Sequence, residues 1–309
     1  MPYIPMYVKA VATASVANIG CLFDAAAMAI EAFADEVTVE EASGDVEVKA
    51  WGNVPGGRMN VAYAAAVHFL KRIYGRSRGV RITVKKGVPV GAGLGSSGAT
   101  AAATVAAINE LLGIGAGVGD LIEAAGAGET LAAGTPHYDN VAASLLGGVV
   151  LIDPKDPYSH LALEPPEWLR IVLFVRRAPT PAKTQAMRAI LPERIDLQEA
   201  SRWAFAAAML AVGLTRGVKR CICFASMGGP VEEARSKLVP RYREAKALAV
   251  QAGALAFNIS GAGPSVFALV EEGREEAVIR ALSSVLEGYE PIVSRVAKKG
   301  AVYATESRR

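Results

Sequence analysis

Alternating and helical spacings of apolar residues predict strands and helices interleaved along the whole chain. Strand-like runs lie at 7–15, 37–41, 46–50, 80–86, 149–152, 171–175 and 265–270, with more strand within 291–302. The turn-like residues 43–45 predict that 37–41 and 46–50 form a hairpin. Helical spacing covers 60–73, 96–112, about 120–133, 197–214 and 230–252.

Two features of this pattern define the expected architecture. Pro240 should divide the last helix, because proline lacks the N–H that a helix interior needs. Helices and strands interleave without a repeat or a low-complexity linker. We therefore expect an α+β protein of two lobes that share sheets, with lobes at 1–160 and 161–309.

Composition narrows the class of protein. The chain has 309 residues, 52% of them hydrophobic, which is enough for a sizeable core. Its net charge of +3 is spread along the chain, so we expect neither a nucleic-acid nor a membrane partner. Three cysteines (Cys21, Cys221 and Cys223) indicate a reducing compartment rather than a disulfide framework. No apolar run reaches the ~18–20 residues of a membrane span, and no signal peptide is evident, so the expected location is the cytoplasm.

The segment PVGAGLGSSGA at 89–99 is the most informative stretch. Gly91, Gly93 and Gly95 at alternate positions allow positive φ and close backbone approach to a ligand. The helix that follows adds free N–H groups and the positive end of its dipole. Ser96 and Ser97 add hydroxyl groups, one of which could bind Mg²⁺. Together these features predict a phosphate cradle.

Three other interpretations of this segment were weighed. Residues 93–98 formally match the dinucleotide pattern G-x-G-x-x-G, but the second strand and the acid expected about 20 residues further on are missing. The Walker A pattern is absent from the chain. A simple glycine turn that caps a helix would explain a lone match, but not the proline, spaced glycines, serines and long helix together.

At this point the sequence resembles a known family. PVGAGLGSSGA is similar to the P-x-x-x-G-L-G-S-S-A signature of the GHMP small-molecule kinases, and AVATASVANIGCLFDAAAMAI and NISGAGPSVFALV fit the same superfamily. The resemblance implies a two-lobed GHMP kinase fold, with an N-terminal lobe like domain 2 of ribosomal protein S5 and a ferredoxin-like α/β C-terminal lobe. It also implies ATP and Mg²⁺ as cofactors, a small-molecule substrate and a homodimer.

The resemblance assigns the nucleotide site. Its ATP-binding residues would be Asn60 beside the base, Lys86, and the cradle itself: Pro89, Val90, Gly91, Ala92, Gly93, Leu94, Gly95, Ser96, Ser97, Gly98 and Ala99. Without the resemblance, a solvated strand end is an equally good interpretation of Lys86. Ser97 and Glu129 match the Mg²⁺ ligands of the superfamily, although Glu129 alone would be read as a solvated helix residue.

Three further blocks resemble the homoserine kinases within that superfamily. Residues 17–24 are similar to A-N-x-x-x-G-F-D, with Leu22 in place of the glycine, and imply that Asn18 and Asp24 hold the substrate. Judged without the resemblance, Asn18 and Asp24 would be capping residues in a strand-to-helix turn. Residues 134–142 are similar to H-x-D-N-V-A and imply that His137 and Asp139 line the pocket.

The third block consists of two segments, and the resemblance implies that they form a clamp for a carboxylate. Residues 183–192 resemble T-x-x-A-R-x-x-L-P, and residues 233–240 resemble a shortened E-x-x-R-x-x-L-x-P. They imply that Arg188 and Arg235 bind the carboxylate and that Thr184 contacts a hydroxyl. Guanidinium groups suit a carboxylate because they offer two parallel donors, although most helix arginines are simply surface residues. Gly261, in a second glycine-rich loop, would close on the phosphates or the substrate.

The resulting expectation is ATP-dependent phosphorylation of L-homoserine, a step of threonine biosynthesis. Its catalytic residues would be Ser97, Glu129, Asn18 and Thr184. Alternatives are another GHMP kinase of the shikimate or mevalonate type, a catalytically silent ATP-binding sensor and, more distantly, a Rossmann oxidoreductase. Whether a general base is used stays open at this point.

Overall fold

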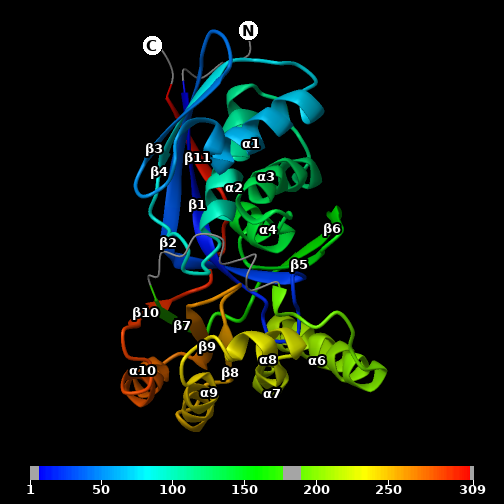
Figure 1. Ribbon diagram of the computed structural model, residues 1–309, viewed down its shortest axis with the longest axis vertical. Helices are drawn as coiled ribbons and strands as arrows, with labels where there is room; N and C mark the ends of the chain where they lie inside the picture. Colours follow the sequence, from blue (N-terminus) through cyan, green and yellow to red (C-terminus); the bar gives the residue numbers. More distant parts are fainter. Residues whose placement is uncertain (1–6, 177–188, 307–309) are drawn as a thin grey trace.

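Two lobes, each built on one β-sheet, make up the computed structural model, which describes residues 7–176 and 189–306 (Figure 1). The larger sheet has the strand order β11-β1-β2-β4-β3, with β5 paired to β2 and β6 to β5. Its strands are β1 (Tyr7–Ala17), β2 (Ala26–Glu41), β3 (Val46–Trp51), β4 (Val80–Lys85), β5 (Val149–Asp153), β6 (Asp156–Leu163) and β11 (Val302–Glu306).

Four helices pack on this sheet: α1 (Val61–His68), α2 (Ser96–Leu111), α3 (Val118–Ala133) and α4 (Tyr138–Leu146) (Figure 1). Short 3₁₀ and π segments, Gly57–Met59 and Phe69–Ile73, flank α1. Helix α2 is almost wholly buried between the sheet and its neighbours. Its many alanines permit this, because small side chains let backbones approach closely.

The smaller sheet forms the second lobe, with the antiparallel order β10-β7-β9-β8. Its strands are β7 (Leu169–Val175), β8 (Ala256–Ile259), β9 (Val266–Glu271) and β10 (Glu290–Ser294). The helices of this lobe are α6 (Leu197–Arg216), α7 (Lys219–Ile222), α8 (Pro230–Ser236), α9 (Tyr242–Gln251) and α10 (Glu275–Ser283), with a 3₁₀ segment at Cys223–Met227. All seven residues of β7 are buried, because separate apolar clusters cover its two faces.

Most of the predicted elements are confirmed, including the break at Pro240: α8 ends at Ser236 and α9 begins at Tyr242. The predicted hairpin of 37–41 and 46–50 is wrong. Strand β4 lies between the two, antiparallel to β2 and parallel to β3. The turn residues 43–45 therefore begin a crossover rather than a tight hairpin.

The strand-to-helix turn expected at 18–24 is also wrong. The segment leads into β2, which pairs with β1 and β5. Residues 26–30 are consecutively buried small and apolar side chains, and such a run fits a strand covered on both faces as well as a helix.

The last described strand lies in the same lobe as the first. β11 (Val302–Glu306) pairs antiparallel with β1 in the larger sheet. The expected division into lobes at residues 160 and 161 stays a prediction. In addition, β11 belongs to the larger sheet, although it lies within 161–309. Within the described parts of the chain, no helix has both the length and the apolar character that a membrane span requires.

Candidate active site

The glycine-rich segment adopts the predicted positive φ angles: 72° at Gly91, 80° at Gly93 and 65° at Gly95. Gly95 is the N-cap residue of α2, so the loop delivers its backbone to the start of that helix. The first turn of α2 has no acidic residue. No carboxylate in that turn therefore offsets the positive end of the helix dipole. The predicted positive φ angles and the helix that follows the loop are thus confirmed, and phosphate binding stays a prediction.

The second glycine-rich loop packs directly on the first. The Ser260 hydroxyl donates a hydrogen bond of 2.6 Å to the carbonyl oxygen of Gly93. A Cβ on Gly93 would lie 2.4 Å from the carbonyl oxygen of Ser260, so no larger residue fits there. The Gly261 N–H donates to the carbonyl oxygen of Ala17 at 3.0 Å. The two lobes therefore meet at the cradle.

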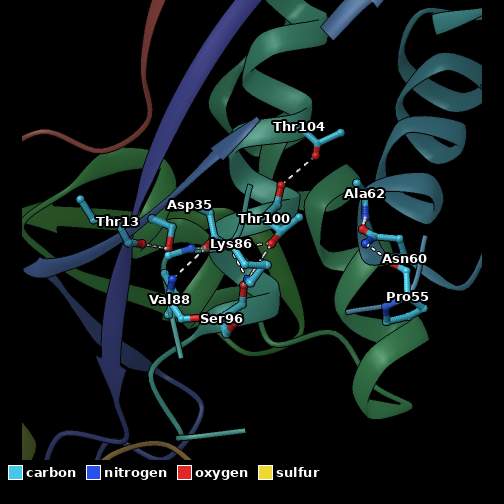
Figure 2. A network of polar contacts seen from close by, with 12 residues as sticks. Thr13, Asp35, Pro55, Asn60, Ala62, Lys86, Val88, Ser96, Thr100 and Thr104 are labelled. Carbon is cyan, nitrogen blue, oxygen red and sulfur yellow. Dashed lines mark hydrogen bonds and ion pairs between the residues drawn. The ribbon is translucent and has the colours of Figure 1, made fainter. Parts of the chain in front are cut away.

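Beneath the cradle, a buried ion pair joins Asp35 on β2 to Lys86 at the end of β4 (Figure 2). The Lys86 ammonium also donates to the Ser96 carbonyl oxygen (2.7 Å) and to the Thr100 hydroxyl (2.9 Å) in the first turns of α2. Burial lowers the pKa of Lys86, and the charge of Asp35 opposes that shift. Lys86 is thus no solvated strand end, and that interpretation is wrong.

The side chains of two other residues expected to bind ATP form hydrogen bonds with the protein itself. Asn60 caps α1 by accepting a hydrogen bond from the Ala62 N–H (2.9 Å), and it donates to the Pro55 carbonyl oxygen (2.7 Å) (Figure 2). The Ser96 hydroxyl donates to the Val88 carbonyl oxygen at 3.1 Å. These contacts order the walls of the site, and direct contact with ATP stays a prediction.

Glu129, near the end of α3, is buried rather than solvated, so that interpretation of it is wrong. One carboxylate oxygen, Oε2, lies 3.3 Å from Nδ1 of His137. The other, Oε1, is buried without a hydrogen-bond partner among the described residues. A buried, unsatisfied carboxylate oxygen suits a cation, because its desolvation needs compensation. Glu129 therefore fits the role of a Mg²⁺ ligand.

Mg²⁺ usually binds few protein oxygens and keeps water and phosphate as its other ligands. Ser97, in the first turn of α2, is partly exposed, and its hydroxyl makes no hydrogen bond to the described part of the protein. Across residues 7–176 and 189–306, no group of three His, Cys, Asp or Glu side chains forms a metal cluster. A buried carboxylate oxygen and a serine hydroxyl are a donor set that suits Mg²⁺ held largely by phosphate.

His137 and Asp139 lie at the start of α4 and influence each other's ionisation. Burial works to lower the pKa of His137, but the hydrogen bond to Glu129 and the charges of Glu129, Asp139 and Asp24 raise it above its usual value. Burial and the negative charge of Asp24 raise the pKa of Asp139 to about 6. The negative charge of Asp24 thus acts on both α4 residues, and a shared role of the three in binding the substrate stays a prediction.

The β1–β2 turn brings Asn18 and Asp24 to the same place, both with positive φ (61° and 54°). The Asn18 side chain accepts from the Asp24 N–H at 2.9 Å and donates to the carbonyl oxygen of Gly261 at 3.0 Å. Arg235, from α8, donates to that same carbonyl oxygen at 2.8 Å, and its guanidinium lies 5.3 Å from the centre of the Phe23 ring. Asn18, Arg235 and Gly261 are therefore one connected group.

A cavity of about 260 Å³ opens beside this group. Asn18, Arg235 and Gly261 supply polar groups, whereas the rest of its wall is mostly apolar: Gly20, Cys21, Phe23, Leu191, Pro192, Ile195, Trp203, Gly229, Pro230, Val231, Glu232 and Ile259. Few polar groups in an apolar wall are typical of small-molecule sites. Thr184 and Arg188 lie outside the described residues.

Sequence reasoning assigned no role to two residues that the structure brings to the site. Asn140, on α4, accepts a hydrogen bond of 2.9 Å from the Ser15 hydroxyl, and both atoms lie against Gly95. It stands within the H-x-D-N-V-A block, so a signal for it existed. Asp35 carries no sequence signal that separates it from the other acids of β2, such as Glu31 and Glu36.

Comparison with known proteins agrees with this fold and site. The profile for the N-terminal domain of GHMP kinases matches residues 60–148, and that for their C-terminal domain matches residues 206–288. The chain therefore belongs to the GHMP kinase family, whose members are ATP-dependent kinases.

Within that family, the chain is similar to homoserine kinases. A homoserine kinase from Aeropyrum pernix is 40% identical, covering 87% of this chain and 89% of its own. One from Pyrobaculum aerophilum is 39% identical, covering 85% and 88%. The crystal structure of homoserine kinase from Cytophaga hutchinsonii superimposes with a TM-score of 0.88 at 32% identity, covering 98% and 99%.

Proposed function

We propose that this enzyme transfers the γ-phosphate of ATP to the hydroxyl group of L-homoserine, with Mg²⁺, to give O-phospho-L-homoserine. The observation that carries the proposal is the meeting of two sites at one loop. Residues 260–263 pack on Gly93 of the cradle, and the carbonyl oxygen of Gly261 receives hydrogen bonds from Asn18 and Arg235. A phosphate donor and an amino-acid acceptor bound at these places would be neighbours.

The cradle serves the triphosphate. Backbone N–H groups of the loop and of the first turn of α2 would bind phosphate oxygens and oppose their charge. Ser97 and Glu129 would hold Mg²⁺, which when bound neutralises charge on the β- and γ-phosphates. The unsatisfied Oε1 of Glu129 supports this assignment.

The acceptor site carries charges that complement an amino acid. Asp24 and Asp139 provide negative charge for an ammonium group, and Arg235 provides a guanidinium for a carboxylate. A sugar would present neither charge. Hydroxy acids such as mevalonate or shikimate would match Arg235 but leave the acidic side without a partner. An amino acid with a terminal hydroxyl fits both ends.

Phosphoryl transfer depends mainly on alignment and on neutralising charge. In this proposal Asn18 fixes the β1–β2 turn, Arg235 fixes the carboxylate, and the hydroxyl of the substrate points towards the cradle. Asp139, which is not among the residues that line the cavity, joins Thr184 and Arg188 in the acceptor site as a prediction from the sequence. The homodimer also stays a prediction, which light scattering of the purified protein would test.

The test is a panel of acceptors with MgATP, scored by ADP release and by identification of the phosphorylated product. L-homoserine should give the highest kcat/KM among L-homoserine, mevalonate, shikimate and galactose. Faster turnover of any other member of the panel would reject the proposed substrate. Tight ATP binding without ADP release from any acceptor would favour the ATP-binding sensor.

A further inference from the structure

The ion pair beneath the cradle has a complete set of hydrogen bonds. Asp35 is fully buried (0% exposed), and the Lys86 side chain is 6% exposed. The Asp35 carboxylate accepts from the N–H groups of Gly87 and Val88 through Oδ1, both at 2.9 Å. Its Oδ2 accepts from the Lys86 ammonium and from the Thr100 hydroxyl, the latter at 2.6 Å.

The hydrogen-bond donors of Lys86 are also fully used. Its ammonium has three N–H donors, and the structure gives it three acceptors: Asp35, the Ser96 carbonyl oxygen and the Thr100 hydroxyl. No donor of this ammonium is left for a phosphate in the arrangement described. A lysine that precedes a phosphate cradle would ordinarily be assigned to the phosphate itself, and the geometry here gives it another role.

The position of the pair determines what it holds. Asp35 accepts hydrogen bonds from the two N–H groups that begin the segment leading into the cradle. On the far side of the cradle, Lys86 donates to the Ser96 carbonyl oxygen of α2, and the hydroxyl of Thr100, also on α2, donates to Asp35. Figure 2 shows Lys86 between Asp35 and the residues Ser96 and Thr100. The entry and exit of the loop are thus tied to one buried charge pair.

Close packing reinforces the tie. A Cβ on Gly87 would lie 2.1 Å from the carbonyl oxygen of Ala34, so the chain after Lys86 runs directly against the strand that carries Asp35. The Thr104 hydroxyl continues the polar contacts along α2 by donating to the Thr100 carbonyl oxygen at 2.8 Å.

We infer that Asp35 and Lys86 are positioning residues that hold the phosphate cradle in its binding shape, and that Lys86 acts through α2 rather than by touching the triphosphate. The inference rests on the proposed nucleotide site, and it assigns Asp35 a part in nucleotide binding. Misplacing the cradle amides weakens every phosphate contact together, whereas the adenosine part of ATP keeps its own contacts.

The experiment separates positioning from stability by using the full chain and three variants. Asp35→Asn leaves a buried ammonium without its counter-charge and should lower the Tm. Asp35→Asn combined with Lys86→Met removes both charges and should recover a large part of that Tm. Calorimetry then measures the Kd of MgATP and of adenosine for each folded variant.

Both Asp35→Asn and the double variant should raise the Kd of MgATP at least about 10-fold and leave the Kd of adenosine within about twofold of wild type. Recovery of Tm without recovery of MgATP affinity is the signature of positioning, because a purely structural role would restore both. A double variant with wild-type affinity for MgATP would overturn the inference.

Two further variants keep the test informative if Asp35→Asn does not fold. Thr100→Val keeps the shape and both charges but removes the hydroxyl that joins them, and it should weaken MgATP binding less than the double variant. Glu275→Gln removes one charge from the partly buried contact with Arg170 in the other lobe (3.9 Å) and should leave MgATP affinity unchanged. Unaltered affinity in Thr100→Val would also count against the inference.

These outcomes are independent of the acceptor. Failure of L-homoserine in the acceptor panel would reject the proposed substrate and leave the MgATP comparison intact. Normal phosphorylation of L-homoserine by a double variant with unchanged MgATP affinity would reject the positioning role alone. A wild-type protein that binds no ATP would overturn both.

Discussion

Oε2 of Glu129 lies 3.3 Å from Nδ1 of His137, and this contact leaves Oε1 of the same carboxylate buried without a hydrogen-bond partner in the described structure. A second Glu–His pair, His68 with Glu123 at 3.2 Å, joins α3 to the residue that ends α1. The two pairs have similar N–O distances, through Nε2 of His68 and Nδ1 of His137, but Glu123 is more exposed than Glu129.

This difference in burial allows one variant to serve as the control for the other. Glu129→Gln should lower kcat by about 100-fold, because the carboxylate proposed to hold Mg²⁺, and with it charge stabilisation of the transition state, would be lost. Glu123→Gln, on the same helix, should leave kcat within about twofold of wild type. Steady-state kinetics at saturating Mg²⁺ measures both. Unchanged turnover in Glu129→Gln would remove Glu129 from the metal site.

Gly95→Ala should abolish most ATP binding. The added Cβ would lie 2.1 Å from the Ser15 hydroxyl oxygen and 2.9 Å from Oδ1 of Asn140, so the start of α2 must move. Gly113 is the control, because it has a similar φ (57°) but nothing within 4 Å of an added Cβ. Both alanines carry the same backbone strain. Equal ATP affinity in the two variants would show that the start of α2 does not bind phosphate.

Arg235→Ala should raise the KM for L-homoserine about 10- to 100-fold, the cost of a hydrogen bond to a charged group, with KM for ATP nearly unchanged. Arg243→Ala is the control, because its guanidinium is exposed and 3.7 Å from Glu233. Circular dichroism confirms that each variant is folded. Comparable increases in both KM values for Arg235→Ala would argue against a carboxylate clamp.

Stability should depend on pH through Asp139. Its pKa is raised from 3.8 in the unfolded chain to about 6 in the fold, so the folded protein favours the neutral acid. The contribution of this group to stability is present below pH 4 and is lost as the pH rises through 6. The loss is on the order of 3 kcal/mol.

Asp139→Asn has no such ionisation, so denaturant unfolding should show it more stable than wild type at pH 8 and similar near pH 4. The unliganded proteins are compared, so that substrate does not stabilise either one. A difference in unfolding free energy that stays constant between pH 4 and pH 8 would contradict the burial of an ionisable Asp139.

The sequence predicted the elements that carry strong local signals. Alternate glycines predicted the positive φ angles of the cradle, and Pro240 predicted a break, because both depend on backbone chemistry that neighbours do not alter. The hairpin prediction failed because sheet order is non-local: nothing in residues 37–50 indicates that β4 will insert between the two strands.

Within the site, the family motifs singled out Glu129 and Arg235, but only the fold explains the burial of the first and the contact of the second. Burial of Glu129 depends on the packing of α3 against its neighbours, and the contact of Arg235 with Gly261 joins residues 26 positions apart. Asp35 could not have been found from its surroundings in the chain, because its partners come from the segment that directly follows β4 and from α2.

The most direct measurement is a crystal structure of the protein with a non-hydrolysable ATP analogue, Mg²⁺ and L-homoserine. The account predicts that the triphosphate lies along residues 91–97 at the start of α2, that Glu129 binds the metal, and that the carboxylate of homoserine contacts Arg235. A triphosphate bound elsewhere, with residues 91–97 making no contact to it, would contradict the account.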